Sequence, residues 1–414
     1  MASVVAVRAA APAVTKPRRA LVRVAMAAVL ANSTWFSATA VVAALQRDWH
    51  LSAGGAAWLV VAVQAGFITG SIAAALMNLP DRIEPRRLIA GSAIAAAAAN
   101  ALLVAAGGLA AAIPSRFLVG VALTGVYAPG VRLVATHYAR GRGVATGVVV
   151  GALTLGSATP HLVRGLGEVP WPATILTTSV LALLAAAVIR PVTAGLDAPP
   201  TPLLNVAAAL RALRARPVRL TTFGYLGHMW ELYAFWAWLP MFVVASRHAV
   251  AGADPARLET GAIVFAAVGV AGLSGAILAG RLADRLGRTT TTSAAMVVSA
   301  ACCLVSPWAY VAPTVVLVAV LLVWGASVIA DSAQFSASVT ELAEPRYAGS
   351  ALTLQLALGF ALTIASIRLV PVAADAIGWR FALVPLAVGP LAGTAAMVRL
   401  RTLPAARRLA HGRR

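Results

Sequence analysis

Apolar segments long enough to cross a lipid bilayer recur along the entire chain, and this repetition limits the folds available to it. Of the 414 residues, 60% are hydrophobic and 11% are charged, which is too much apolar surface for an ordinary soluble domain. A helix needs about 20 apolar residues to span the hydrocarbon core. The sequence therefore predicts an all-α polytopic membrane protein with twelve transmembrane helices, over residues 20–45, 54–77, 88–107, 109–131, 143–164, 171–190, 219–245, 259–279, 289–307, 312–332, 349–372 and 379–398.

Two similar charged turns indicate that these segments form two related halves. The run from Gly280 to Arg288 lies between two apolar segments, and a similar run from Asp81 to Arg87 occupies the same setting. Asp81 and Asp284 are 203 residues apart (284 − 81), about half of the 414-residue chain. We therefore expect two pseudo-symmetric six-helix bundles. Their boundaries are residues 20–190 and 219–398, with a linker at 191–218 and tails at 1–19 and 399–414.

Arginine and lysine residues are concentrated on one side of the predicted helices. They cluster before the first span, in the linker, in the charged turns and after the last span, whereas the opposite loops hold few. Positive charge is retained in the cytoplasm during insertion, so we expect a multi-pass protein of the cytoplasmic (inner) membrane with both termini inside. This distribution explains the net charge of +20 without nucleic acid, for which the sequence contains no recognition motif.

The second charged turn carries a signature, Gly-x-x-x-Asp-Arg-x-Gly-Arg, that resembles the major facilitator superfamily. Together with two sets of six spans, it implies a secondary transporter that works by alternating access. In that family the acid of this turn pairs with arginine and stabilises one access state. The first copy has Met77 and Glu84 where glycine is usual, so the second copy is the more intact. The implied gating residues are Asp81, Arg82, Arg86, Gly280, Asp284, Arg285, Gly287 and Arg288.

Three ionisable side chains inside predicted spans are candidates for proton coupling, because such groups are costly in lipid and usually face a cavity or a partner. Glu231 lies near the centre of the seventh span, three residues after His228, so both share one helical face. Together they could carry a proton, or they could bind each other and only fasten helices. Asp331, beside Ser332 and Gln334, could be a second proton site, an inner-gate residue or a polar helix end.

A fourth candidate, Arg116, precedes Gly120 in the fourth span, and this Arg-x-x-x-Gly pattern resembles the fourth-helix motif of the same superfamily. The resemblance implies a role in proton coupling. An arginine keeps its proton, so Arg116 would bias a nearby acid or bind an anion. Alternatively, its side chain extends to the outer membrane interface.

Polar and aromatic residues near the middle of the first, second and seventh spans are the candidates for substrate binding. Parallel halves related by an axis along the membrane normal place the substrate site at their interface, near the midplane. Tryptophans can also anchor a helix at the membrane interface, and Asn32 could also join helices. The substrate-binding candidates are Asn32, Trp35, Phe36, Gln64, His228, Trp230, Tyr233 and Trp236.

The sequence contains no sign of nucleotide-driven or enzymatic chemistry. It lacks the Gly-x-x-x-x-Gly-Lys-Ser/Thr phosphate loop, and Cys302 and Cys303 are interpreted as small buried residues rather than metal ligands. We expect a monomer without cofactor or metal, not an enzyme, whose partners are a small-molecule substrate, protons (favoured over sodium) and membrane lipid. Efflux of a lipophilic or cationic compound is favoured. Proton-coupled uptake or exchange of a small anion is the alternative, and a non-transporting receptor is a remote one.

Overall fold

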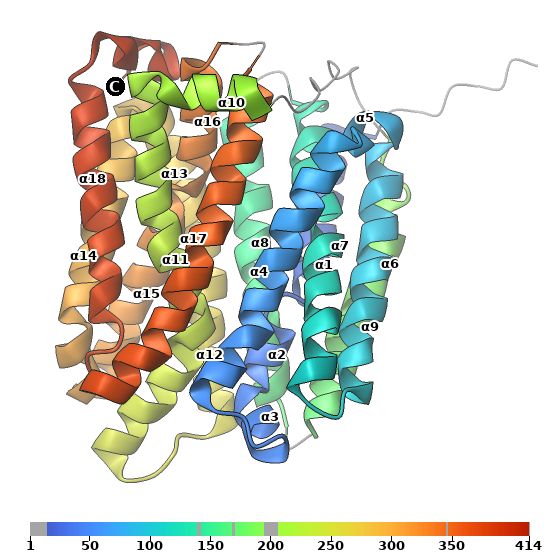
Figure 1. Ribbon diagram of the computed structural model, residues 1–414, viewed down its shortest axis with the longest axis vertical. Helices are drawn as coiled ribbons and strands as arrows, with labels where there is room; N and C mark the ends of the chain where they lie inside the picture. The colour runs from blue at the N-terminus through green and yellow to red at the C-terminus, as the bar shows by residue number, and fades with distance from the viewer. Residues whose placement is uncertain (1–14, 139–141, 168–169, 194–205, 345–346, 414) are drawn as a thin grey trace, which may run out of the picture.

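The computed structural model describes residues 15–138, 142–167, 170–193, 206–344 and 347–413, and its helices form two bundles side by side. In Figure 1 the N-terminal bundle is blue to teal and the C-terminal bundle is green to red. The short helices α5 and α10 and the C-terminus lie together at one end of the molecule, which we call the linker end.

The N-terminal bundle begins with a broken helix and continues with longer ones. Its elements are α1 (Pro17–Asn32), α2 (Ser37–Ala40), α3 (Val42–Asp48), α4 (Ala53–Leu76), α5 (Leu79–Arg82), α6 (Pro85–Ala101) with a 3-10 turn η1 (Leu102–Ala105), α7 (Leu109–Ala135), α8 (Arg142–Gly165) and α9 (Trp171–Ile189).

The C-terminal bundle follows the amphipathic helix α10 (Val206–Arg214), which crosses the linker end (Figure 1). Its elements are α11 (Arg216–Ala251), α12 (Arg257–Val264) continued by a π-helical turn η2 (Phe265–Ala271) and α13 (Gly272–Leu286), α14 (Arg288–Val311), α15 (Thr314–Ala330), α16 (Ser332–Leu342), α17 (Ala348–Ile377), the 3-10 turn η3 (Val384–Ala387), α18 (Val388–Arg401) and the terminal 3-10 helix η4 (Pro404–Gly412).

Every predicted span coincides with helix, which confirms the all-α membrane fold. Nine helical segments of the described chain are long and apolar enough to cross a bilayer. The other three predicted spans correspond to α1–α3, to α11 and to η3 with α18. The first and the last of these are interrupted, and α11 carries His228, Glu231 and several tryptophans in its middle, which lowers its mean hydropathy.

The break between α1 and α2 is favoured by polar side chains that bond to the backbone of their own helix. The hydroxyls of Ser33 and Thr34 donate to Leu30 O (2.6 Å) and Ala31 O (2.9 Å). Hydroxyls that bond back to a preceding turn bend helices. The chain consequently turns over residues 33–36, and Trp35 and Phe36 lie in this turn instead of on a continuous helix.

Glycines allow α4 and α7 to approach until their backbones touch, so glycine is required there. A Cβ added at Gly66 would lie 1.9 Å from Phe117 O, whereas one added at Gly91 would meet no atom within 4 Å. We expect Gly66→Ala to lower the free energy of unfolding by about 1 to 3 kcal/mol through overpacking. Gly91→Ala should be neutral or stabilising, since alanine favours helix. Thermal unfolding in detergent measures both, and equal melting temperatures would contradict the close packing.

Close helix approach also joins the two bundles. The glycine at position 151 of α8 lies against Leu273 of α13, where an added Cβ would be 3.0 Å from Leu273 Cα. Gly261 of α12 lies against His161 O of α8 in the same way, at 2.4 Å. A second contact between the bundles is made by α4 and α17. The space enclosed by these two contacts holds the candidate site.

Candidate functional site

A cavity of about 70 Å³ lies between the two bundles. Its walls come from α1, α4, α7 and α8 of the first half and from α11, α15, α16 and α17 of the second half. The lining residues are Asn32, Trp35, Phe67, Leu123, Tyr127, Val150, Leu153, Thr154, Ser157, Tyr225, Met229, Leu232, Tyr233, Trp236, Ile329, Ser332, Ser336, Leu356 and Phe360. Both halves therefore build one shared pocket.

Aromatic rings from the two halves meet at this cavity. The ring centroid of Trp35 lies 5.6 Å from that of Tyr233, and Phe67 lies 4.4 Å from Phe360. Phe36 extends the cluster by contacting the ring of Trp236 at 6.1 Å. Ring pairs at such separations are attractive, so these contacts hold the halves together beside the cavity.

The two halves also contact each other through α4 and α17 nearer the end opposite the linker end. The guanidinium carbon of Arg368 on α17 lies 4.8 Å from the ring centroid of Trp58 on α4. Because α4 and α17 run in opposite directions, this pair lies farther from the linker end than the pair Phe67 and Phe360. The cavity is thus covered by packed side chains of α4 and α17 on the side away from the linker end.

The cavity is lined by aromatic rings, aliphatic groups and hydroxyls, and none of its described lining residues carries a charge. None of its described lining residues is an aspartate, glutamate, lysine, arginine or histidine. The indole nitrogens of Trp35 and Trp236 are buried and have no hydrogen-bond partner. An unpaired buried donor costs free energy, so a ligand with an acceptor group would relieve that cost at both indoles.

The predicted substrate-binding residues separate into two groups. Asn32, Trp35, Tyr233 and Trp236 line the cavity, and Phe36 packs directly behind it. Gln64 is fully buried on α4 with neither amide atom paired, but it is not among the lining residues.

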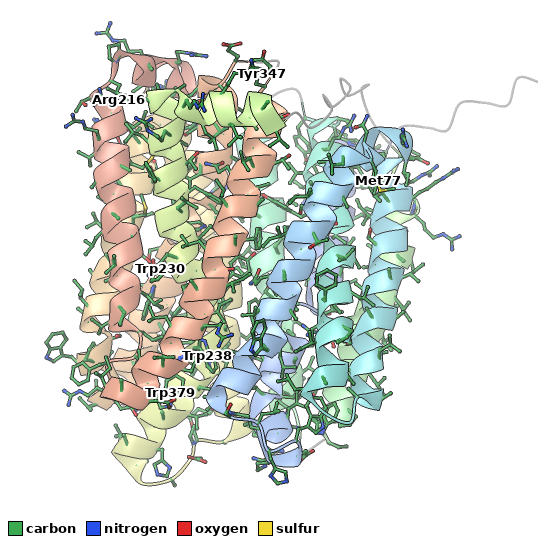
Figure 2. The ribbon with its side chains drawn as sticks, viewed as in Figure 1. Met77, Arg216, Trp230, Trp238, Tyr347 and Trp379 are labelled. Atoms are coloured by element: carbon green, nitrogen blue, oxygen red, sulfur yellow. The ribbon has the colours of Figure 1, made fainter. Side chains whose placement is uncertain are left out.

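Trp230 and His228 project elsewhere. Figure 2 labels Trp230 at mid-height of the C-terminal bundle, above Trp238 and Trp379. The Trp230 indole nitrogen lies 3.4 Å from Pro385 O of η3, so this ring packs inside its own bundle. Neither residue lines the cavity.

Glu231 faces the interior of the C-terminal bundle, where three donors meet one of its oxygens. Its Oε1 accepts hydrogen bonds from Ser299 Oγ (2.6 Å), from Cys303 Sγ (3.2 Å) and from the indole of Trp324. These partners belong to α14 and α15. The sequence predicts Glu231 as a buried acid, but no local signal points to Ser299 or Trp324, and Cys303, which was expected only to pack, is a hydrogen-bond donor.

His228 is paired with Asp331, not with Glu231. Its Nδ1 lies 2.8 Å from Asp331 Oδ1, and both side chains are almost fully buried. Asp331 occupies the junction between α15 and α16, and the next residue, Ser332, lines the cavity. The predicted proton candidates of the second half thus lie directly behind the cavity wall.

Arg116 is enclosed within the N-terminal bundle, with 1% of its surface exposed. It donates to Ser37 Oγ (3.1 Å) and Asn100 Oδ1 (2.8 Å), and to the carbonyls of Thr34 and Trp35. Among the described residues no carboxylate forms an ion pair with it. The side chain bonds to the turn that follows α1 and is buried within the bundle, and it is not among the residues that line the cavity.

Arg288 of the intact charged turn pairs with Glu341, an acid that was not predicted from the sequence. Arg288 Nε contacts both carboxylate oxygens of Glu341 at 2.9 and 3.1 Å, and its NH1 donates to Gln334 Oε1 (2.7 Å). Glu341 Oε2 also accepts from Ala410 N of η4 (3.0 Å). This network joins α14, α16 and the C-terminal tail.

The other members of the intact turn are arranged around this network. Gly280 is buried, Asp284 and Arg285 are exposed, and Gly287 has φ +91°, a conformation that favours glycine. Within the described part of the chain no ion pair involves the Asp284 carboxylate; its backbone carbonyl accepts from Arg413. The gating role of these residues remains a prediction.

In the first turn, the acid that pairs is Glu84. Its carboxylate contacts Arg86 Nε at 2.6 Å and Arg87 Nε at 3.2 Å, and Arg86 also donates to Arg190 O. Arg82 is exposed. The side chain of Asp81 lies outside the described residues.

The described residues contain no group of three or more His, Cys, Asp or Glu side chains gathered as metal ligands. The two cysteines are buried and free.

Comparison with known proteins agrees with this architecture. The sequence matches the family described as Major Facilitator Superfamily over residues 24–366. The human organic anion transporter MFSD10 has a similar structure, with a TM-score of 0.66 and 15% identity over 92% of this chain and all of that one. Among curated proteins, none matches this sequence significantly. Two six-span bundles around a shared cavity and a family match over most of the chain lead to one conclusion: this chain belongs to the Major Facilitator Superfamily, a family of transporters.

Proposed function

We propose that the protein is a secondary transporter that exports a neutral lipophilic compound across the cytoplasmic membrane in exchange for protons. The observation that carries this proposal is the uncharged lining of the central cavity, to which both halves contribute aromatic rings. Apolar sites with a few convergent polar groups suit small lipophilic ligands. A hydrogen-bond acceptor on the ligand would engage the donors of Trp35 and Trp236.

Anion transport is the weaker alternative for this cavity. The similar structure MFSD10 is described as an organic anion transporter, but likeness at 15% identity extends to the fold alone. A buried anion needs a cation or several donors. Arg116 donates hydrogen bonds to the turn after α1, and His228 pairs with Asp331. Neither residue lines the cavity. A lipophilic cation would also lack a partner, because Glu231 is directed toward Ser299 and Trp324.

Proton coupling is proposed for the buried acids of the C-terminal bundle. Asp331 and Glu231 are each almost fully buried, and Asp331 directly precedes the cavity-lining Ser332 on the chain. Carboxylates kept inside a membrane protein commonly serve ion pathways. A change in protonation at Asp331 would alter its contact with His228 and thereby the position of the cavity wall formed by α16.

Export is the direction that the substrate chemistry favours. A lipophilic compound dissolves in the bilayer and enters a cell unaided, so energy is needed only to remove it. The arginine-rich linker end would face the cytoplasm, as positive charge does, and both termini would lie there.

A stabilisation screen tests the proposed substrate class, because a ligand that binds the folded state raises the melting temperature. Uncharged aromatic compounds with an acceptor group should stabilise the purified protein. Trp35→Phe and Trp236→Phe keep an aromatic ring but lose the indole donor. Each should weaken binding by about fivefold to tenfold, the value of one hydrogen bond of roughly 1 kcal/mol.

Trp308→Phe is the matched control, since Trp308 is 66% exposed and far from the lining residues. It should leave binding unchanged. A hit whose affinity is insensitive to Trp35→Phe and Trp236→Phe, or a screen in which only small anions stabilise, would refute the proposed site.

A further inference from the structure

A second and larger hollow lies beside the central cavity, toward the linker end. It has a volume of about 740 Å³ and is lined by α4, α6, α7 and the first turns of α17. Most of its lining is small or apolar, including Gly91, Gly125 and Gly349. We call this hollow the α4–α17 groove. The groove forms because α17 packs on α4 between Phe67 and Trp58 but not along the part of α4 nearer the linker end.

The groove adjoins the central cavity. Phe67, Tyr127 and Leu356 line both hollows. Their side chains form the boundary between a shared aromatic pocket and a groove bordered by membrane-spanning helices. Anything that fills the groove therefore ends against the wall of the cavity.

The mouth of the groove at the linker end is basic. Arg87 and Arg132 belong to its lining, together with the amide of Asn78, and none of the described lining residues is acidic. The Arg87 side chain is 77% exposed, and its Nε lies 3.2 Å from Glu84 Oε2. A ligand and Glu84 would therefore both contact the Arg87 guanidinium. An apolar groove between membrane-spanning helices that ends in arginines matches an amphiphile with an anionic head.

We propose that the α4–α17 groove binds one anionic phospholipid of the adjacent leaflet, with an acyl chain along α4 and α7 and the phosphate at Arg87 and Arg132. This site is separate from the proposed substrate and does not depend on it. An acyl chain in the groove would oppose movement of α17 toward α4 and α7, because it would fill the space between them.

The glycines of the groove provide variants that fill it without disturbing packing. A Cβ at Gly91 or at Gly349 meets nothing within 4 Å. Gly91→Trp and Gly349→Trp would therefore place an indole in the space of the acyl chain. Gly107→Trp is the matched control, because Gly107 is equally open but lies outside the groove.

Native mass spectrometry and melting temperature measure binding of dioleoyl phosphatidylglycerol, with dioleoyl phosphatidylcholine as the neutral lipid of equal chains. The wild-type protein and Gly107→Trp should retain phosphatidylglycerol preferentially and gain stability from it. Gly91→Trp and Gly349→Trp should bind it about tenfold more weakly or worse, since several buried methylene groups are lost. Equal binding by all variants, or equal retention of the two lipids, would overturn the proposal.

Substitution of the exposed Arg87 tests the head-group contact even where a tryptophan variant fails to fold. Arg87→Gln should reduce the preference for phosphatidylglycerol over phosphatidylcholine, whereas Arg399→Gln, exposed on the other bundle, should keep it. An unchanged preference in Arg87→Gln rejects the site. So does stabilisation of the wild type by inorganic phosphate alone to the same extent, because the acyl chain would then contribute nothing.

Discussion

Replacing Arg116 with methionine is expected to lower the free energy of unfolding by about 3 kcal/mol or more. The side chain is 1% exposed and donates to Thr34 O and Trp35 O, two carbonyls in the turn that breaks the first helix, and to Asn100 Oδ1. Methionine fills most of the volume but leaves these acceptors without donors, and each buried unpaired group costs about 1 to 3 kcal/mol. Thermal and denaturant unfolding in detergent measure the loss.

Arg116→Lys should recover only part of that stability. An ammonium has no planar fork with which to reach two carbonyls and the Asn100 amide together. Arg368→Gln is the matched control, because Arg368 is exposed and contacts a ring instead of backbone carbonyls; its effect should be small. If Arg116→Met unfolds at the same temperature as the wild type, the buried network does not stabilise the first helix.

The same network shows why the membrane fold could be predicted from the sequence while the first helix could not. Lipid supplies no partners for the backbone, so each long apolar run must be helical, and the charged turns fix where the runs end. The chain after Asn32 is also held by Arg116 of α7, which donates to Thr34 O in the turn, and by Asn100 of α6, whose Oδ1 accepts from Arg116 and from Ser37. The hydroxyls of Ser33 and Thr34 favour a bend there, but nothing in the local sequence identifies these distant partners.

The sequence predicts how deep in the membrane a site residue lies along its helix. It does not predict which side of that helix faces the cavity. The middle of the first and seventh spans was expected to hold the cavity, and Asn32, Trp35, Tyr233 and Trp236 do line it. Most of the lining comes from other residues, such as Tyr127 and Phe360, which look like ordinary members of their helices in the sequence. Nothing in a single sequence tells which face of such a helix meets the other bundle.

The seventh span also illustrates the limit of helical spacing. Residues three apart, such as His228 and Glu231, share a face, but their side chains differ in direction enough to reach different neighbours. His228 meets Asp331 and Glu231 meets Ser299 and Trp324, about 70 to 100 residues further along the chain. Helical spacing therefore identified both groups but could not identify their partners.

Asp331→Asn and Glu231→Gln are expected to abolish transport driven by a pH gradient. Both acids are almost fully buried and already paired, Asp331 with His228 and Glu231 with three donors. The amides are nearly isosteric, so each retains an acceptor oxygen for those contacts while losing the ability to take up a proton. A gradient does work only on a carrier whose protonation changes between its two access states. Proteoliposomes loaded with a compound from the stabilisation screen measure this flux.

Exchange of the same compound across the membrane separates coupling from folding. Counterflow requires the carrier to alternate with substrate bound but needs no net proton movement, so both variants should retain it while gradient-driven flux falls at least about tenfold. Asp254→Asn is the matched control, since the Asp254 side chain is 71% exposed and pairs with His248 at 2.8 Å, away from the cavity. A variant that loses both activities points to a structural role for that acid. If both Asp331→Asn and Glu231→Gln keep full gradient-driven flux, the protons travel elsewhere, and the buried acids of the C-terminal bundle only fasten its helices.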